Sequence, residues 1–421
     1  MKESGIDWIG QIPEEWEVIK VKFFTYMKGR IGWQGLKADE FIDEGPYLVT
    51  GTDFKNGRVN WDTAYHISQK RYEQAPEIQL KQGDLLVTKD GTVGKLALID
   101  ELPDSASLNS HLLVLRPLFN RYDNHFLYYV LSSLEFKNYF QKVSIGSTMD
   151  SLSQEKMGEF IFALPNINEQ NSISRYLDKK TAQLDKAKAI LEEQIQKLKD
   201  YRASLIYETV TKGLDKTVPM KDSGIDWIGQ VPEGWEITKH KYIMTKVKEI
   251  CAHYEGQDIL SLTRQGVVVR DIESGKGKMP ASFDGYQFLE KGDLLFCLFD
   301  IDVTPRCVGV VENNGLTSSA YSRFRLDDKI SVYYYYYLFL SMDEDKVLLH
   351  LSKNLRHSLT EDDFGIIETV LPSYEEQLRI ADYLSKVTKS IDEIVQLKQK
   401  QIGNINKQRQ TLIYDYVTGK R

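Results

Sequence analysis

The sequence predicts an α+β fold: two mixed α/β domains joined by two long antiparallel coiled-coil helices, related by a pseudo-two-fold internal repeat. The first observation is that Ser4–Glu17 recurs at Ser223–Glu236, with 12 of 14 positions identical at an offset of 219 residues. The second is that the segment beginning at Leu164 matches the segment beginning at Leu371. The third is a seven-residue apolar spacing after each of these segments. Between the matched ends the two copies share only scattered residues, which indicates one scaffold that presents two different surfaces.

The repeat also sets the expected domain boundaries. A chain of 421 residues has room for two to four domains, each with its own core. We expect the first mixed domain at residues 1–163 and the first long helix at 164–215. The second mixed domain is expected at residues 216–370, and the second long helix at 371–421.

The composition is that of an ordinary globular protein, with 42% hydrophobic and 27% charged residues. No apolar run reaches the roughly 18 residues that a membrane span needs, and Met1–Gly10 lacks the basic and apolar regions of a signal peptide. Cys251, Cys297 and Cys307 are odd in number and show no C-x-x-C spacing, so we expect reduced thiols and no zinc site. These features predict a cytoplasmic protein without a membrane partner.

The net charge of −7 and the pI of about 5.7 are unusual for a nucleic-acid-binding protein, because such proteins are mostly basic. The sign of the whole chain is weak evidence, however. Acidic helices can dominate the sum while basic loops face a phosphate backbone.

Each mixed domain is expected to contain a β-hairpin. Gly83–Thr88, the tight turn Lys89-Asp90-Gly91 and the apolar run that follows have the pattern of two paired strands. In the second copy, the run from Gly292 is followed by a longer connection through Thr304 and Arg306 before the next strand begins.

Buried helices and aromatic anchors complete each mixed domain. His125–Phe136 and Tyr334–Asp345 align at an offset of 209 residues, and both are interpreted as buried helices. The five tyrosines Tyr333–Tyr337 are expected to pack in the core, not to stack on bases. The tryptophans of the duplicated segment are expected to be packing anchors; these are Trp8, Trp16, Trp227 and Trp235.

A long coiled-coil helix follows each mixed domain. The first seam consists of Leu177, Leu184, Leu191, Leu198 and Leu205, with Ile173, Ala187 and Ile195 beside it. The second consists of Leu384, Ile391, Lys398, Ile405 and Leu412, supported by Val387, Ile394 and Ile402. Lys398 interrupts the second seam and indicates local polarity, and Gly403 weakens the helix by about 1 kcal/mol relative to Ala.

Chain connectivity predicts that the two helices are antiparallel. The first helix ends where the second mixed domain begins, so the second helix must run back to bury its own stripe against the first. The mixed domains would then lie at opposite ends. Some 40 helical residues at ~1.5 Å each span about 60 Å, so the helices would act as a ruler.

The sequence contains no complete catalytic or metal-binding motif. Gly91–Lys95 lacks the spacing of a phosphate-binding loop, and Asp363-Phe364-Gly365 has no other kinase motif beside it. No N-P-P-aromatic tetrapeptide of adenine methyltransferases is present. His111 and His357 are expected to be polar surface residues, not ligands. We therefore expect no catalytic residue, no metal ion and no enzyme activity in this chain.

The chain resembles the specificity subunit of Type I restriction–modification systems over essentially its whole length. The resemblance depends on the duplicated SGIDWIGQ-x-P-E-x-W-E segment, the GDLL hairpins, the L-P-x-x-x-E-Q segments and the helix ends LIYETVT and LIYDYVT. GSTMDSLS at residues 146–153 and NLRHSLTEDDF at residues 354–364 are also similar to the family's segments that enter each helix.

The resemblance implies two target-recognition domains that each read one half of a split, asymmetric site on double-stranded DNA. It implies that the two helices form the spacer and bind two modification subunits, which hold S-adenosylmethionine and methylate adenine. Restriction subunits that use ATP for translocation and cleavage would join them. No cofactor is expected in this chain itself.

Residues for DNA contact are sought among exposed polar and cationic side chains on loops at matching places in both copies, because these side chains read bases and phosphates. The first-domain candidates are Lys28, Arg30, Trp33, Gln34, Thr88, Lys89, Asp90, Thr92, Asn109, Ser110, His111, Ser147 and Thr148. The second-domain candidates are Thr263, Arg264, Gln265, Thr304, Arg306, Ser318, Ser319, Tyr321, Asn354, Leu355, Arg356 and His357.

One alternative from another class of function stays open. A double-headed protein-interaction scaffold that never contacts DNA would explain the acidic pI and the coiled coil. It would not explain why loops rich in Arg, Lys, Asn, Ser and Thr diverge while the frame around them stays the same.

Overall fold

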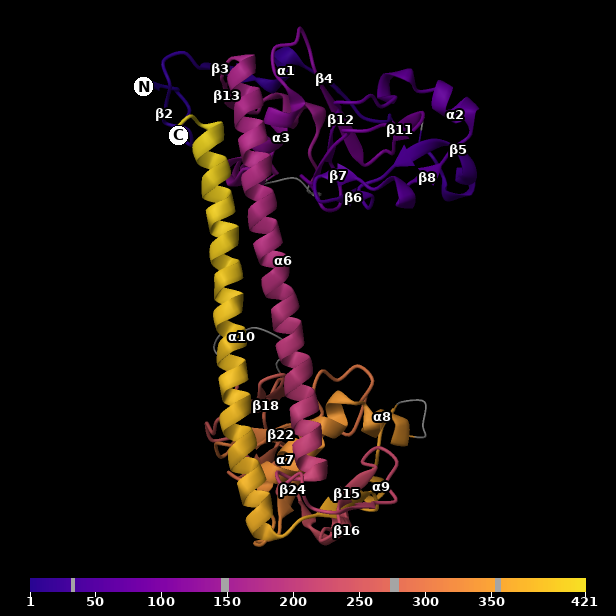
Figure 1. The fold of residues 1–421 in the computed structure, drawn as a ribbon, viewed down its shortest axis with the longest axis vertical. Helices are drawn as coiled ribbons and strands as arrows, with labels where there is room; N and C mark the ends of the chain where they lie inside the picture. The colour runs from indigo at the N-terminus through magenta and orange to yellow at the C-terminus, as the bar shows by residue number, and fades with distance from the viewer. Residues whose placement is uncertain (32–34, 145–150, 273–279, 353–356) are drawn as a thin grey trace. The chain divides into compact units, whose positions relative to one another are not determined.

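The computed structural model describes residues 1–31, 35–144, 151–272, 280–352 and 357–421 (Figure 1). The chain divides into two compact units. Unit 1 comprises Met1–Leu191 with Lys400–Arg421, and unit 2 comprises Glu192–Gln399. Both long helices therefore contribute a segment to each unit. The fold is α+β with an internal repeat, as predicted.

The main sheet of unit 1 has six strands in the order β4-β12-β9-β10-β7-β6. A second, three-stranded sheet has the order β11-β5-β8, in which β5 pairs in parallel with β11 and antiparallel with β8. Two small antiparallel pairs, β1-β2 and β3-β13, complete the unit. The strands are β1 (Lys2–Glu3), β2 (Gln11–Ile12), β3 (Glu17–Lys20), β4 (Thr25–Lys28), β5 (Ile42–Val49), β6 (Phe54–Lys55), β7 (Arg58–Val59), β8 (Tyr65–His66), β9 (Leu85–Thr88), β10 (Leu96–Leu98), β11 (Ala106–Leu108), β12 (Leu112–Pro117) and β13 (Ile161–Leu164).

The helices of unit 1 pack mainly against one face of the six-stranded sheet. The core on that side includes Leu85, Leu115, Phe126 and Leu177, and Leu177 belongs to the long helix. A second core, with Leu86 and Leu108, fills the space between the two sheets. The helices are α1 (Val21–Phe24), η2 (Ala38–Glu40), η3 (Trp61–Thr63), α2 (Gln69–Glu73), η4 (Pro76–Ile78), α3 (Asn124–Ser132), α4 (Leu134–Ser144), α5 (Gln154–Gly158) and α6 (Ile167–Lys212).

Unit 2 repeats this plan with fewer strands. Its sheet β17-β24-β21-β22 has the same order and the same antiparallel pairing as β4-β12-β9-β10 of unit 1. The strands are β14 (Met220–Asp222), β15 (Gln230–Pro232), β16 (Glu236–Lys239), β17 (Met244–Val247), β18 (Leu260–Thr263), β19 (Gly266–Val269), β20 (Gln287–Leu289), β21 (Leu294–Phe296), β22 (Val308–Val310), β23 (Gly315–Thr317), β24 (Ser322–Leu326) and β25 (Glu368–Leu371). The helices are η5 (His240–Tyr242), α7 (Val332–Glu344), α8 (Val347–Leu351), α9 (Glu361–Gly365) and α10 (Tyr374–Val417).

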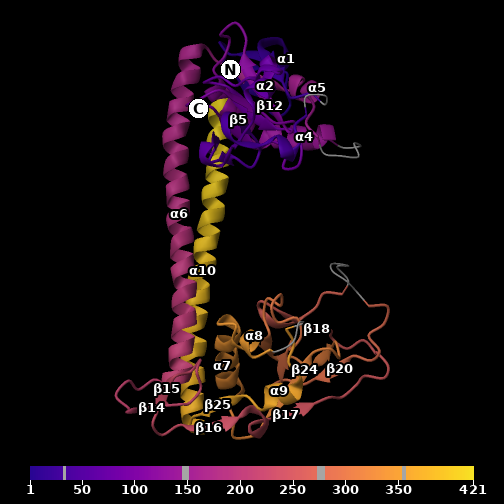
Figure 2. The same cartoon turned by 90° about the vertical axis from the view of Figure 1, so that its right-hand side faces the viewer.

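The two long helices are antiparallel within each unit, as predicted. In unit 1 the rings of Tyr176 and Tyr416 stack at 4.6 Å, and Asp185 faces Arg409 at 3.6 Å. In unit 2 Gln194 accepts a hydrogen bond of 2.7 Å from Lys398 Nζ, and Arg202 lies 3.2 Å from Asp392. In both units the partner's number falls along α10 as the number rises along α6. Figures 1 and 2 show the two helices side by side.

The polar position in the second seam has a specific partner. Lys398 is half-buried, and its hydrogen bond to Gln194 accounts for a charged residue at a seam position. Gly403 does not interrupt α10, which continues to Val417.

The duplicated segments contact the ends of the long helices in equivalent ways. In unit 1 the Tyr414 hydroxyl donates to the Trp8 carbonyl at 3.1 Å, and in unit 2 the Tyr207 hydroxyl donates to the Trp227 carbonyl at 3.1 Å. The glycine that ends each helix has a positive φ of 71° and lies against a duplicated tryptophan. A Cβ on Gly419 would meet Trp16, and a Cβ on Gly213 would meet Trp235. The matched sequences therefore form two matched joints.

Most local predictions are confirmed, but one predicted helix is interrupted. β9 and β10 form the predicted hairpin, as do β21 and β22. Trp16 and Trp235 are buried, and Tyr334 and Tyr335 lie in the core, although Tyr333 is exposed. The predicted helix from His125 to Phe136 is instead two helices, α3 and α4, which meet at Ser133.

The three cysteines are free and buried. In the part of the chain that the structure describes, none of the helices combines the length and apolar character that crossing a membrane would require.

Candidate nucleic-acid interface

The two mixed domains share an ion pair between an arginine and a buried aspartate, which fixes the start of each central hairpin. In unit 1 Arg116 on β12 donates to both carboxylate oxygens of Asp84, at 2.7 and 2.6 Å. In unit 2 Arg325 donates to the equivalent Asp293 at 3.1 Å, and the fully buried Arg323 donates to it at 2.6 Å. These aspartates belong to the GDLL sequences. The repeated motif therefore positions β9 and β21, whose ends lead into the candidate loops.

Three loops of unit 1 enclose a hollow of about 360 Å³. They are the turn after β5, the tip of the β9–β10 hairpin and the β11–β12 connection. Five sequence candidates line this hollow, namely Thr88, Asp90, Thr92, Asn109 and His111. The structure thus brings together residues up to 23 positions apart in the sequence.

Hydrogen bonds shape the hairpin tip of this hollow. The Thr88 hydroxyl donates to the Thr92 carbonyl at 2.6 Å and accepts from the Lys95 amide at 2.9 Å. The Asp90 carboxylate lies 3.3 Å from Nδ1 of His111, an exposed ring. Gly91 and Gly94 have φ values of 68° and 82°, which suit glycine in a tight turn. Thr88 is therefore a supporting residue, whereas Asp90 and His111 present polar groups to solvent.

Unit 2 has a hollow of about 190 Å³ at the equivalent place. It is enclosed by the β18–β19 turn, the β21–β22 connection and the β23–β24 connection. Five sequence candidates line it, namely Thr263, Arg264, Thr304, Arg306 and Tyr321. Although the loops differ in sequence and length, both hollows lie against the same strands of the shared sheet.

The β21–β22 connection is held by several contacts. The Thr304 hydroxyl donates to the Asp300 carbonyl at 2.8 Å, and the His357 carbonyl accepts from the Ile301 amide at 3.1 Å. Arg306 donates to the Tyr336 hydroxyl on α7 at 3.2 Å. The ring of Tyr321 lies 5.9 Å from that of Phe299, and burial raises the pKa of Tyr321. Arg306 and Tyr321 are thus restrained before any ligand binds.

Arg30 does not lie on an exposed loop, contrary to the sequence-based expectation. Its side chain is 4% exposed and donates at 2.9 Å to the Leu108 carbonyl and to the Ser107 hydroxyl. Burial lowers the pKa of its guanidinium to about 10, so the group stays charged at neutral pH. Both acceptors belong to β11 and lie 77 and 78 residues further along the chain. Arg30 therefore holds this strand from within the domain.

The other candidates divide into three groups. Five candidates lie on the loops that enclose the two hollows but do not line either hollow, namely Lys89, Ser110, Gln265, Ser318 and Ser319. Lys28 is exposed at the end of β4, and His357 is half-buried beside the β21–β22 connection. The candidates outside the described residues are Trp33, Gln34, Ser147, Thr148, Asn354, Leu355 and Arg356.

Sequence reasoning missed several residues that line the unit 1 hollow. Thr50 and Thr52 follow β5, and Lys95 ends the hairpin tip. Phe41 and Tyr65 stack at 4.7 Å on its rim. The polar run Thr50-Gly51-Thr52 directly after a buried strand could have indicated Thr50 and Thr52. No local signal marks Phe41 and Tyr65, since their contact arises from the pairing of β5 with β8.

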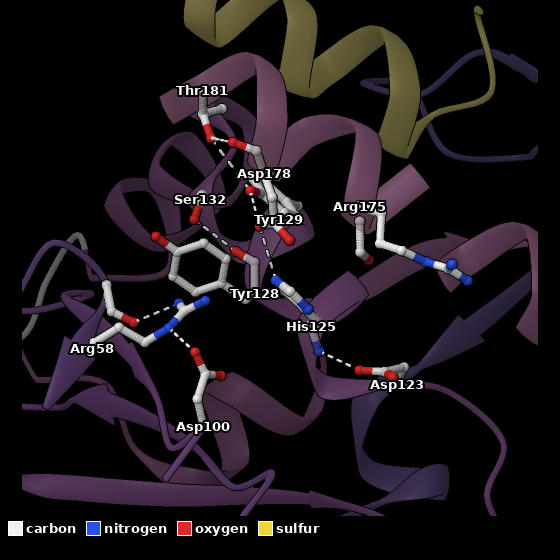
Figure 3. A network of polar contacts seen from close by, with 12 residues as sticks. Arg58, Asp100, Asp123, His125, Tyr128, Tyr129, Ser132, Arg175, Asp178 and Thr181 are labelled. Carbon is white, nitrogen blue, oxygen red and sulfur yellow. Dashed lines mark hydrogen bonds and ion pairs between the residues drawn. The ribbon is translucent and has the colours of Figure 1, made fainter. Parts of the chain in front are cut away.

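A polar cluster links the unit 1 domain to its long helix (Figure 3). Asp178 on α6 accepts from the Tyr129 hydroxyl at 2.6 Å, and its carboxylate lies 2.9 Å from Nε2 of His125. Burial and the hydrogen bond to Asp178 raise the pKa of Tyr129. In unit 2 Tyr337 and Thr388 make the corresponding contact between α7 and α10, at 3.2 Å. These contacts fix each mixed domain on a long helix.

The Type I restriction modification DNA specificity domain family matches residues 13–199 of this chain. A putative type I restriction enzyme specificity subunit, MjaX of Methanocaldococcus jannaschii, is 24% identical over 98% of this chain and 95% of its own length. The EcoBI specificity subunit of Escherichia coli is 26% identical over 98% of this chain and 87% of its own length. This chain is thus similar to type I specificity subunits over nearly its whole length.

Solved structures share the fold of this chain. A chain from a study of complex assembly and conformational transition in the type I R-M system covers 98% of this chain and 100% of its own length, with a TM-score of 0.72 and 12% identity. The HsdS subunit from Thermoanaerobacter tengcongensis covers 98% of both chains, with a TM-score of 0.50 and 12% identity. The described residues of this chain contain no group of three or more His, Cys, Asp or Glu side chains placed to hold a metal ion.

Proposed function

We propose that this chain is the DNA sequence-recognition subunit of a Type I restriction–modification complex. Each mixed domain would read one half of a bipartite, asymmetric DNA site. The reading domains would comprise residues 1–163 and 216–370, and residues 164–215 and 371–421 would form the spacer helices. The chain would catalyse nothing itself.

The observation that supports this proposal most strongly is the pair of unlike hollows on one repeated scaffold. Asp84 and Asp293 fix the same hairpin in both units, while the side chains that line the hollows differ. Reading a base pair requires donors and acceptors at groove-facing loops, and those loops supply Asp, Asn, His, Thr, Tyr and Arg side chains. Unlike loops predict unlike half-sites, so the complete site would not be a palindrome.

The partners are inferred from the similarity to type I specificity subunits. We infer that α6 and α10 bind two modification subunits that hold S-adenosylmethionine and methylate adenine, and that ATP-dependent restriction subunits can join them. The DNA-contacting residues would come from the loops around the two hollows, with the candidates named above as a starting set.

A purified complex with the modification subunit tests the proposal. Binding of a fluorescent duplex that contains the methylated site should weaken steeply as salt rises from 50 to 200 mM, because contacts to phosphates release counterions. Single-molecule sequencing of host DNA should show methylated adenines in a bipartite motif only when this chain is co-expressed. A complex that forms but neither binds DNA nor methylates it would favour the interaction scaffold instead.

A further inference from the structure

Arg264 lies at the tip of a short, ordered β-hairpin in unit 2. β18 and β19 pair from Leu260 opposite Val269 to Thr263 opposite Gly266, which leaves Arg264 and Gln265 as the turn. The Thr263 hydroxyl accepts from the Gln265 amide at 3.1 Å and donates to the Gly266 carbonyl at 3.0 Å. The turn is therefore fixed by its own hydrogen bonds, and the tip projects an exposed arginine.

The guanidinium of Arg264 is available to a ligand. In the part of unit 2 that the structure describes, it makes no hydrogen bond or ion pair with another residue. Arg306, on the facing connection, is already engaged by Tyr336. The two arginines line the same hollow with Thr304 and Tyr321. Arg306 is thus restrained by a hydrogen bond, whereas Arg264 lies in the hairpin turn without such a contact among the described residues of unit 2.

The equivalent hollow of unit 1 has different chemistry. Its charged groups are Asp90 and Lys95, with His111 beside the carboxylate, and no arginine is among the described residues that line it. Both hollows contain a cation, so contact with phosphates alone would not explain why arginines line one hollow and a carboxylate beside a histidine lines the other. An arginine tip in one unit and a carboxylate in the other indicate that the loops differ in the base edges they match.

The major groove is about 12 Å wide and admits a two-stranded β-ribbon, and guanine presents two acceptors there, O6 and N7. The planar fork of an arginine matches this pair of acceptors with two parallel hydrogen bonds, whereas lysine offers only a point charge. Resting on the proposed function, we propose that the β18–β19 hairpin enters the major groove and that Arg264 reads a guanine in the half-site recognised by unit 2.

Methylation mapping tests this assignment. The wild-type chain, Arg264→Ala and Arg264→Lys are each co-expressed with the modification subunit in a host without other adenine methyltransferases, and methylated motifs are read by single-molecule sequencing. For Arg264→Ala we expect discrimination at one G·C pair to fall roughly 5- to 150-fold, as for the loss of one bidentate contact. Arg264→Lys should relax the same position, because it keeps the charge but loses the fork.

The half-site read by unit 1 is the internal control, and it should be unchanged in both variants. The assignment is overturned if the relaxed position is not a G·C pair, or if Arg264→Ala lowers methylation equally at all sequences while Arg264→Lys restores it. The latter result would make Arg264 a phosphate contact. If the wild-type complex gives no sequence-dependent methylation, the proposed function itself fails, which is a separate result.

Discussion

At the residue scale, the buried ring of His240 makes the stability of the folded chain depend on pH. Its ring is fully buried against Phe339 and Phe364, and Nδ1 lies 3.0 Å from the Phe364 carbonyl. Removal from water lowers the pKa of His240 to about 3, so the folded state keeps it neutral. In the unfolded chain the imidazole has a pKa of about 6.5 and takes up a proton below that value.

Because the folded pKa is the lower one, the stability that His240 contributes is present above pH 6.5 and is lost as pH falls towards 3. The free energy of unfolding should fall by up to about 1.4 kcal/mol per pH unit in this window. Urea unfolding at pH 7.0 and 5.0 should show a smaller pH dependence in His240→Asn than in the wild type. His111→Asn, at an exposed histidine, is the control and should keep the wild-type dependence. Equal dependence in all three proteins would contradict the expectation.

Gln377 explains at the same scale why a glutamine ends each L-P-x-x-x-E-Q segment. Its buried amide oxygen accepts from the Ser331 amide at 2.8 Å, and its nitrogen donates to the Pro372 carbonyl at 2.9 Å. Gln170 makes the matching bonds to Asp123 and Pro165 in unit 1. Each glutamine therefore ties the start of a long helix to the start of a core helix.

Gln377→Met keeps most of the volume but leaves two buried backbone groups without partners. We expect the unfolding transition of unit 2 to lose about 1–3 kcal/mol. Glu375→Met, at an exposed position two residues before Gln377, should change stability by less than about 0.5 kcal/mol. Thermal and urea unfolding followed by circular dichroism measure both. A loss as large for Glu375→Met would show that the effect is not due to the buried hydrogen bonds.

At the element scale, the sequence predicts well what depends on neighbours in the chain. Sustained apolar spacing locates α6 and α10, and the run around Asp90 locates a hairpin. The break at Ser133 was missed because its hydroxyl bonds locally, donating to Val130, in a way that no apolar pattern reveals. The parallel pairing of β5 with β11 joins residues 59 positions apart and leaves no local signal.

The same division applies to the candidate interface. Polar loop composition found residues such as Asp90 and Arg264, which line the two hollows. It could not separate them from Arg30, whose acceptors Ser107 and Leu108 come from a distant strand. Burial of a loop residue is a tertiary property, so composition alone overestimates which cations are exposed.

Gly403 gives a test of helix propensity at this scale. It lies inside α10, where an added Cβ would meet no heavy atom within 4 Å. Gly403→Ala should raise the free energy of unfolding by up to about 1 kcal/mol, because alanine loses less conformational entropy in a helix. Gly224→Ala is the matched control: it also has open space, but its φ of 73° is left-handed and should cost about 1–2 kcal/mol. Urea unfolding should move in opposite directions for the two variants; the same sign for both would contradict this account.

At the scale of the whole molecule, the proposed spacer role of the antiparallel helices predicts that the gap between the half-sites depends on helix length. Pairs such as Asp185 with Arg409 and Arg202 with Asp392 set the register of α6 against α10. An insertion in one helix alone shifts these pairs, whereas matched insertions in both helices restore them on either side. Four residues add one turn, or about 6 Å, which corresponds to roughly two base pairs at ~3.4 Å each.

We therefore expect four helical residues inserted after Ile195, together with four after Ile402, to lengthen the unread gap by one or two base pairs. Both half-sites should stay unchanged, because no residue of the loops around the hollows is altered. The insertion after Ile195 alone serves as the control and should lower methylation, since the register on one side is lost. Single-molecule sequencing of methylated adenines gives the gap directly. If the double insertion retains methylation with the original gap, the helices do not determine the spacing, and the separation of the half-sites must instead be set by the modification subunits.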